Sequence, residues 1–423
     1  MTHWHLNHAD LAPAVAAAAT LFQQRLAHWS ADPDIAASND NLAEILAAHD
    51  AGKVLAEALS MRAPFAGAAG FMVALPNGYS GFYAQDAAVA LVRRVDRGET
   101  PENALEWLTN LLKVPNACGT AVMALWGIAC HEAIELVPGI QLLPATSLPE
   151  TETRARVLRP PDHRSMAIGA GMLSSTPTAA LTTPATVSPL LYPTGAGAPP
   201  HQDDPLRLQT LLDDARLALT LCGPSHPIAA GHWFEFDDPD IHSTFRSGGI
   251  SLRHIDIVPM DFEPPHQIDS AQAKRVVAAF LGMSADVRTK VRLSLIRFNQ
   301  ALRRSPHEDR ALDLAIALES LLVDNAGENT YRLGLRAALL LGGSLAQRKH
   351  TRAVIGALYA LRSKLVHDGV LPQAVKVTGT GKRPSAEVVK DATVLAGRLL
   401  ERIVSRGYIP DWDEYELQPD STP

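Results

Sequence analysis

The sequence is poor in cysteine. Only three occur among 423 residues, at Cys118, Cys130 and Cys222. They are too few and too scattered for a disulfide framework, and none stands in the CxxC spacing of a thiolate zinc site. We therefore expect a protein of a reducing compartment.

Long apolar runs are also absent. No run reaches the roughly 18–20 residues that a helix needs to cross a bilayer. The first residues lack the basic stretch and cleavage pattern of a secretory signal. We find neither a GxSxG elbow nor a paired-carboxylate signature. These absences predict a cytoplasmic protein without membrane contact, and they give no support to the two kinds of hydrolase that use those motifs.

The composition is that of a globular protein, with 47% hydrophobic and 20% charged residues, which excludes a mostly disordered or fibrous chain. The length exceeds what one core usually serves, so two or three domains are expected. We predict an α+β fold with a mostly helical region at 1–120, a β-rich region at 121–265, a helical bundle at 266–408 and an acidic tail at 409–423.

Apolar residues recur at helical spacing in the first and third of these regions. In the N-terminal region the predicted helices are 11–28, 42–61, 85–97 and 101–112. In the C-terminal region they are 270–282, 286–304, 308–324, 330–341, 344–367 and 385–406. Long helices with short connections indicate an antiparallel bundle.

The middle region carries short apolar and alternating runs that are typical of strands. The predicted strands are 121–128, 133–137, 140–143, 232–236 and 250–258, and an amphipathic helix is predicted at 206–221. Two segments allow two interpretations each. Residues 64–80 form a loop or short strands, and residues 165–200 form a linker or an irregular sheet.

Charge is unevenly distributed along the chain. Residues 271–407 hold 23 Lys and Arg against 11 Asp and Glu, a net +12, whereas the remainder is at −19 within an overall −7. Such a split is a recognised hint of nucleic-acid contact. An equally good interpretation is that the acidic part docks on the basic part and neutralises it. Both can hold, and a covered basic surface would be an autoinhibited one.

Arg362 and His367 form an Arg-x4-His pair near the end of the predicted helix 344–367. About one such pair is expected by chance from the numbers of Arg and His, so the spacing alone carries no information. The surrounding residues are more informative. Arg362 falls on one helical stripe with Tyr359 and Val366. A guanidinium on an apolar stripe must be paired, or must face a ligand or a second chain.

Glu319 stands on the apolar face of an earlier helix and needs a cationic partner there, for which Arg336 and Arg362 are the candidates. A structural interpretation is open, in which a buried ion pair fixes the register of the helices.

Three stretches of the C-terminal region resemble an Apea-like HEPN domain over roughly residues 270–407. They are 311–322 (ALDLAIALESLL), 331–338 (YRLGLRAA) and 358–369 (LYALRSKLVHDG). A weaker similarity, at 124–128 and 138–144, is to the upstream region of larger bacterial proteins that carry this domain.

The resemblance implies a bundle of four to five helices and a metal-independent RNA endonuclease, often in phage defence or toxin systems, that needs no cofactor. The family's Arg-x(4–6)-His motif maps onto Arg362 and His367. The polar position after the arginine, usually Asn, Asp or His, is Ser363 here, and Ser363 and Glu319 would be supporting residues. Some members are catalytically silent binding or dimerising modules, which is the alternative function.

These residue types suit the chemistry. A histidine titrates near neutral pH and can take the proton of a ribose 2′-OH, while an arginine offsets charge on the phosphoryl oxygens. Five residues along a helix correspond to a rotation of roughly 140° and a rise of about 7.5 Å. Either the helix unwinds near 368–369, or two protomers pool their motifs. The family precedent is a dimer with a shared cleft.

The expected partners are RNA, a second copy of the chain, and a protein trigger or inhibitor, with the N-terminal two-thirds sensing a signal or restraining the nuclease. Further basic side chains of the bundle, among them Arg288, Arg292 and Arg304, are candidates for the RNA track or are ordinary solvated residues. The residues assigned to RNA binding are Arg348, Lys349, Arg352 and Lys364.

Three further patterns receive non-functional interpretations. His3, His5 and His8 are expected in a frayed terminus rather than a metal site. The segment 232–242, with His232, Glu235 and His242, has metal-type ligands without a recognised spacing and is assigned to a solvated loop. Residues 379–383 (GTGKR) lack the complete phosphate-loop pattern and are predicted to form a flexible basic loop.

Overall fold

We describe the protein from a computed structural model. The residues described are 6–36, 42–75, 78–158, 176–196, 203–223, 225–245, 264–304, 306–323 and 329–417. The predicted strand 250–258, the residues His3 and His5, and the last residues of the tail lie outside them. The chain groups into two compact units, and each is assembled from several stretches of sequence.

Unit 1 comprises residues 1–121, 184–209 and 233–251. Its helices are α1 (His8–Ser30), α2 (Pro33–Ala36), α3 (Leu42–Ser60), α4 (Ala84–Asp96), α5 (Pro101–Leu111) and α8 (Pro239–Phe245). The four helices predicted for the N-terminal region are confirmed to within a few residues. Thr100 begins α5 by accepting a hydrogen bond from the backbone N–H of Asn103, and Pro101 occupies the first turn, where its missing N–H costs nothing.

A small antiparallel sheet in unit 1 has the order β2-β1-β8. Its strands are β1 (Phe71–Leu75), β2 (Gly78–Phe82) and β8 (Leu191–Pro193). Residues 71–75 and 78–80 therefore form short strands, the second of the two interpretations given to 64–80. The buried ring of Phe65 contacts Phe71 and Phe82 edge-on, with centroid distances of 5.9 and 6.0 Å.

Unit 2 comprises residues 122–183, 210–232 and 252–423. Among the described residues, the largest sheet has the order β5-β6-β7-β3-β9. Its strands are β3 (Ala117–Trp126), β5 (Ile134–Val137), β6 (Ile140–Pro144), β7 (Ala179–Val187) and β9 (Ile228–Phe236). β3, β7 and β9 contribute residues to both units. The Pro138-Gly139 turn joins β5 to β6 as a hairpin, and Gly139 takes a φ of 83° there.

Parts of the segment 165–200 are strands, β7 and β8, while its residues 165–175 lie outside the description. β3 is buried over Ala121–Trp126, as its unbroken apolar sequence predicts. Before the bundle, the elements absent from the prediction are α2 and α8 of unit 1 together with β4 (Ile128–Ala129), η1 (Ala145–Ser147), α6 (Glu152–Leu158) and β10 (His266–Gln267). The mixed α+β fold class is confirmed.

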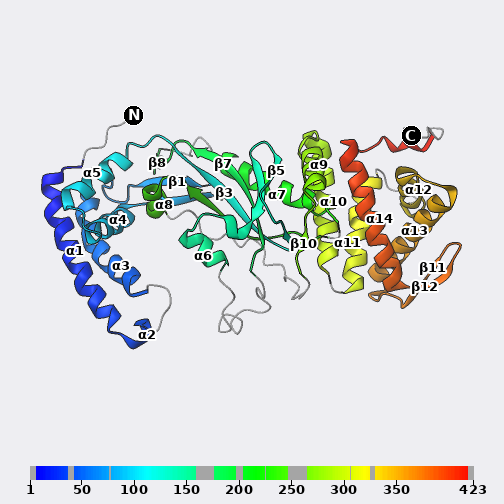
Figure 1. The fold of residues 1–423 in the computed structure, drawn as a ribbon, viewed down its shortest axis with the longest axis horizontal. Coiled ribbons are helices and arrows are strands. Elements are labelled where there is room, and N and C mark those ends of the chain that lie inside the picture. The colour runs from blue at the N-terminus through cyan, green and yellow to red at the C-terminus, as the bar shows by residue number, and fades with distance from the viewer. Residues whose placement is uncertain are drawn as a thin grey trace. The chain divides into compact units, whose positions relative to one another are not determined.

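The C-terminal region is helical, and all six helices predicted from the sequence are present (Figure 1). They are α9 (Ser270–Leu281), α10 (Ala285–Arg303), α11 (His307–Leu322), α12 (Asn329–Leu341), α13 (Leu345–Asp368) and α14 (Ser385–Arg406). α14 packs against the other five, because apolar residues from Val388 to Val404 cover a wide strip of its surface and are buried. The strands β11 (Ala374–Val377) and β12 (Gly381–Pro384) and the helix α15 (Trp412–Leu417) were not predicted.

The helix predicted at 206–221 is α7 (Asp203–Leu219), and its acidic residues bind basic residues of α10. Arg292 Nε donates to Asp214 Oδ1 at 2.7 Å, and Arg292 Nη2 donates to Asp213 Oδ2 at 2.5 Å. Arg288 Nε lies 3.8 Å from Asp214. This contact places acidic residues from before the bundle on the basic bundle itself, as one of the two charge interpretations expects. Burial raises the pKa of Asp214 despite the lowering effect of Arg292.

Candidate functional site at the end of helix α13

Helix α13 carries the Arg-x4-His pair. It begins with a capping box, in which the backbone N–H of Gln347 donates to Ser344 Oγ and the backbone N–H of Ser344 donates to Gln347 Oε1. It ends at Gly369, whose φ of 72° is left-handed and whose N–H donates to Leu365 O at 3.0 Å. A residue other than glycine would have a strained backbone at this position. The helix is therefore continuous from Arg362 through His367.

Arg362 lies beside Glu319 of α11. Its Nη2 is 3.8 Å from Glu319 Oε2, and its Cζ lies 5.7 Å from the centroid of the Tyr359 ring. The side chains of Arg362 and Glu319 are 28% and 22% exposed. Of the two partners considered for Glu319, the structure provides Arg362. The guanidinium is thus held at the edge of the core, with part of its surface facing solvent.

His367 is exposed in the last turn of α13. Because the helix does not unwind until after His367, the two side chains keep the helical separation of roughly 140° and about 7.5 Å. Unwinding at 368–369 therefore does not bring them together within one chain. Ser363 is half-buried, and Val366, predicted to share the apolar stripe, is 54% exposed because this end of α13 extends beyond the packed region.

The four residues assigned to RNA binding form two groups on α13. Arg348, Lys349 and Arg352 lie in its first two turns, and Lys364 follows after 12 residues, a rise of about 18 Å along the axis. Lys349, Arg352 and Lys364 are exposed, whereas Arg348 is half-buried. The Arg352 guanidinium lies over the Tyr331 ring of α12, with its Cζ 4.8 Å from the centroid.

Several other basic residues of the bundle are already paired. Arg288 and Arg292 bind α7, and Arg304 Nε donates to Asp313 at 3.2 Å. Asp313 is buried in α11 and also accepts from Arg297. These guanidinium groups therefore stabilise contacts between helices, and they do not form an open row of positive charge along which RNA could bind.

A basic hairpin follows α13 directly. Residues 379–383, predicted to be a flexible loop, form the turn and most of the second strand of the β11–β12 hairpin, with φ of 86° at Gly379 and 88° at Gly381. Lys376 and Lys382 are paired directly across the hairpin and are both exposed. The sequence does contain a pattern typical of such a hairpin, because Gly379 and Gly381 flank Thr380 between two short alternating runs.

The segment 232–242 is partly buried, so its assignment to a solvated loop is wrong for Glu235. This side chain lies in β9, is 8% exposed, and accepts a hydrogen bond from Trp233 Nε1. His242 Nε2 of α8 lies 3.2 Å from Glu235 Oε2. Across the described stretches of chain, no group of three or more His, Cys, Asp or Glu is arranged to hold a metal ion.

The expectation of a frayed terminus also fails for His8. Its Nε2 lies 3.0 Å from Thr109 Oγ1 of α5, which anchors the start of α1. Over the described residues, no helix has the length and hydrophobicity needed to span a membrane.

The candidate site thus consists of a partly exposed Arg362 beside Glu319 and Tyr359, an exposed His367 about 1.4 turns further along α13, and a basic hairpin after them. Comparisons with protein-family models, with curated proteins and with solved structures find no match for this chain.

Proposed function

We propose that the C-terminal helical region is a HEPN-type, metal-independent RNA endonuclease. The observation that carries the proposal is that one unbroken helix carries both Arg362, part-exposed beside Glu319, and an exposed His367. An arginine and a histidine together supply charge neutralisation and proton transfer, which is what cleavage of RNA by its own 2′-OH requires.

In this reaction His367 takes the proton from the ribose 2′-OH, and the resulting oxygen attacks the neighbouring phosphorus. The P–O5′ bond breaks, the leaving 5′ oxygen takes a proton from water, and the products are a 2′,3′-cyclic phosphate and a 5′-OH end. The proton held by His367 then passes to solvent. Arg362 binds the phosphoryl oxygens as negative charge builds on them. Glu319 and Ser363 act as positioning residues. DNA lacks the attacking hydroxyl and is not cut.

The site is completed by a second copy of the chain. Within one helix the two side chains diverge, so Arg362 of one protomer meets His367 of another across a two-fold axis. Val366 and Val370, at 54% and 69% exposure beside His367, supply apolar surface for this contact.

The rest of the chain restrains or triggers the nuclease in this proposal. The α7–α10 ion pairs are an example of acidic residues covering basic ones. We place the activity in the cytoplasm, in phage defence or a toxin-like stress response, with a protein as the trigger or inhibitor.

The test is incubation of the purified protein with RNA in EDTA, next to His367→Ala and Arg362→Ala. We expect the wild type to cut and both variants to lose at least about 100-fold in rate, because His367→Ala removes the proton-transfer group and Arg362→Ala removes the group that stabilises the developing charge. His350→Ala removes another exposed histidine of α13 and is the matched control, expected to cut at the wild-type rate. Equal cleavage by the wild type and both site variants would exclude the catalytic assignment.

A second candidate function is a non-catalytic interaction module. In that function the Arg362–Glu319 contact only holds α13 against α11, and Arg362 takes no part in a reaction. The pair is partly exposed and 3.8 Å apart, so its loss should cost less than about 1 kcal/mol, rather than the several expected for a buried pair. Loss of RNA cleavage in Arg362→Ala at nearly unchanged stability separates the two functions in favour of the nuclease.

A further inference from the structure

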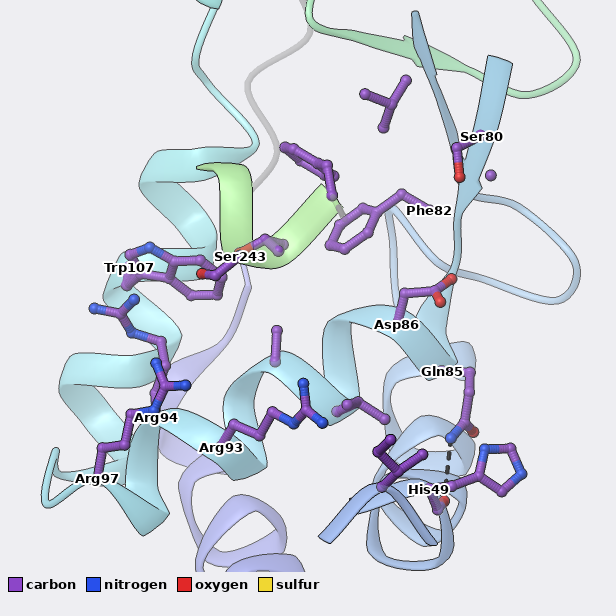
Figure 2. Close-up of a pocket in the computed structure, with 17 residues that line it drawn as sticks. His49, Ser80, Phe82, Gln85, Asp86, Arg93, Arg94, Arg97, Trp107 and Ser243 are labelled. Carbon is purple, nitrogen blue, oxygen red and sulfur yellow. Dashed lines mark hydrogen bonds between the residues drawn. The ribbon is translucent and has the colours of Figure 1, made fainter. Parts of the chain in front are cut away.

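Unit 1 contains a cavity of about 300 Å³. One face of α4 lines it, with contributions from α3, β1, β2, α5 and the end of α8 (Figure 2). Arg94 in its wall binds Glu99 at 2.7 Å and Asp240 at 3.0 Å, and its Cζ lies 4.4 Å from the centroid of the Trp107 ring. Arg94 thus attaches the end of α4 to α5 and α8, which is a structural role. The surface that points to a ligand lies instead in the C-terminal region.

Tyr331 of α12 and Arg352 of α13 form an exposed pair, the Tyr331–Arg352 platform. The Arg352 Cζ lies 4.8 Å from the centroid of the Tyr331 ring, and Tyr331 is still 50% exposed. At Gly334, one turn after Tyr331, a Cβ would lie 3.1 Å from both Cγ and the carbonyl oxygen of Arg352. The glycine therefore allows α12 and α13 to approach closely at the point where Arg352 reaches Tyr331.

An aromatic ring with a guanidinium beside it is a surface on which an unpaired RNA base stacks. Because Arg352 already lies over Tyr331 in the free protein, a base binds there with little further ordering of side chains. α12 and α13 carry only one acid between them, Asp368, so these two helices offer little repulsion to a phosphate. Bases within a duplex hide their faces, and the platform therefore favours a single strand.

One face of α13 leads from the platform to His367. Five residues fall within about 60° of one another around the helix axis, namely Lys349, Arg352, Gly356, Ser363 and His367. The buried residues of α13 lie outside this sector, and Lys349, Arg352 and His367 are exposed. Arg352 and His367 are separated by a rise of about 22 Å, which is room for several nucleotides.

Gly356 lies in the middle of this face, and packing does not explain its presence. A Cβ at this position would meet no heavy atom within 4 Å among the described residues, the backbone of its own helix aside. A glycine inside a helix is less stable than an alanine there, so the residue has a cost. Gly334 offsets that cost through the contact with Arg352, whereas Gly356 leaves the surface of α13 open to a chain that passes close to it.

We propose that single-stranded RNA lies along this face of α13, with one unpaired base stacked on the platform and the strand passing over Gly356 to His367. Lys349, about one turn before Arg352, contacts a phosphate of the same strand. This inference rests on the proposed nuclease function and names its substrate class.

The test is fluorescence anisotropy of the full-length chain with a labelled single-stranded RNA, compared with the same RNA annealed to its complement. The measurements use the His367→Ala chain as the parent, which the proposed reaction leaves unable to cut, so that binding is read without cleavage. We expect the single strand to bind at least about tenfold more tightly than the duplex, because only the single strand offers a base to the platform. Equal affinities would overturn the assignment to single-stranded RNA.

Variants of Tyr331 test the platform. Tyr331→Ala should weaken binding of the single strand by about 5- to 100-fold, the range expected for the loss of one stacked base. Tyr331→Phe keeps the ring and should bind as the parent chain does. Tyr408→Ala removes another exposed tyrosine, outside α12 and α13, and is the matched control. If Tyr331→Ala binds as tightly as the parent, no base stacks at the platform.

A larger side chain at Gly356 tests the path of the strand. Gly356→Gln should fold normally, because the new side chain enters open space, and circular dichroism checks this. It should nevertheless bind the single strand several-fold more weakly, since the side chain occupies the path. Ala278→Gln, at an exposed position of α9, is the control and should bind as the parent does. Parent affinity in a folded Gly356→Gln would contradict the path.

Cleavage is measured separately, in chains that keep His367, so that the two proposals can fail independently. Single-stranded RNA that binds with the expected losses but is not cut would remove the nuclease assignment and support the binding face. RNA that is cut, with binding unchanged in Tyr331→Ala and Gly356→Gln, would overturn the binding face and leave the nuclease.

Discussion

Arg336 is a fully buried guanidinium in the C-terminal region, with no exposed side-chain surface. Its Nη1 donates to Leu322 O at 2.7 Å, its Nε donates to Glu416 at 2.5 Å, and its Cζ lies 5.4 Å from the Trp412 ring centroid. Trp412 Nε1 in turn donates to Leu321 O at 3.0 Å. One side chain of α12 thus joins the end of α11 to α15, which explains why Arg336 was not available to Glu319.

We expect Arg336→Met to destabilise the protein by about 2–4 kcal/mol. The variant removes the one hydrogen bond that Arg336 donates to the buried Leu322 carbonyl and leaves Glu416 without its arginine partner, although Glu416 is partly exposed and regains water. Urea unfolding followed by circular dichroism measures the change. Arg398→Met, at an exposed position of α14, is the control and should stay within about 0.5 kcal/mol. Equal stabilities for the two variants would show that the Arg336 contacts contribute nothing net.

At the scale of elements, the α7–α10 pair shows how a helix from outside the bundle is attached to it. Asp214 is 5% exposed and has its pKa raised by burial, an effect that Arg292 opposes. An acid whose pKa is higher in the folded state than in the unfolded state stabilises the fold at low pH. That contribution is lost as the pH rises through the folded-state pKa.

Arg292→Ala should therefore destabilise the fold more at pH 7 than at pH 4. Without Arg292 the pKa of Asp214 rises further above its usual value of 3.8, so at neutral pH the fold must either keep a proton or bury a charge. We expect a loss of about 1–3 kcal/mol at pH 7 and less at pH 4. Thermal unfolding across this pH range checks the sign, and a larger loss at pH 4 would contradict it.

The β11–β12 hairpin presents Lys376 and Lys382 as a directly opposed, exposed pair. Like charges at such a position are destabilising, which an RNA phosphate at the hairpin would offset. In the proposed nuclease we expect the double variant Lys376→Ala, Lys382→Ala to bind RNA more weakly. The plot of log association constant against log salt concentration, which has a negative slope, should become less steep by about 1.4.

Fluorescence anisotropy with a single-stranded RNA, measured at several salt concentrations, tests the hairpin. Lys53→Ala with Lys113→Ala removes two exposed lysines of unit 1 and should leave the slope unchanged. If the hairpin variant keeps the wild-type slope, these lysines do not contact phosphate.

At the scale of the whole molecule, the proposed site belongs to a pair of chains rather than to one. Because α13 is continuous, Arg362 and His367 of one chain point in different directions and cannot act on the same phosphate. A closed two-fold dimer repeats the same contact twice and so creates two composite sites.

Mixing the inactive variants Arg362→Ala and His367→Ala should therefore restore RNA cleavage. In a mixed dimer one site combines the intact Arg362 of one chain with the intact His367 of the other. With random exchange, about a quarter of the wild-type activity is expected. The mixture is assayed after subunit exchange, and each variant alone serves as the control. No recovery in a mixture shown by sedimentation to be dimeric would contradict a shared site.

The sequence by itself determined the long helices of the N-terminal and C-terminal regions, and it names the residues of the proposed site. Apolar residues at helical spacing encode the N-terminal and C-terminal helices locally, and a start signal such as Thr100-Pro101 acts within one turn. The sequence also limits the cationic partner of Glu319 to Arg336 or Arg362, because an acid on an apolar helical face must be paired with a nearby positive charge.

Only the tertiary structure decided which distant groups meet. Glu235 falls within the predicted strand 232–236, but the strand pattern does not reveal its partners, and only the structure shows it buried against Trp233 and His242. The cavity in unit 1 combines α4 with the end of α8, elements separated by more than 140 residues of sequence. Helical periodicity reports which face of an element is buried, whereas the choice of its neighbour is set by long-range packing, which leaves no periodic trace in the sequence.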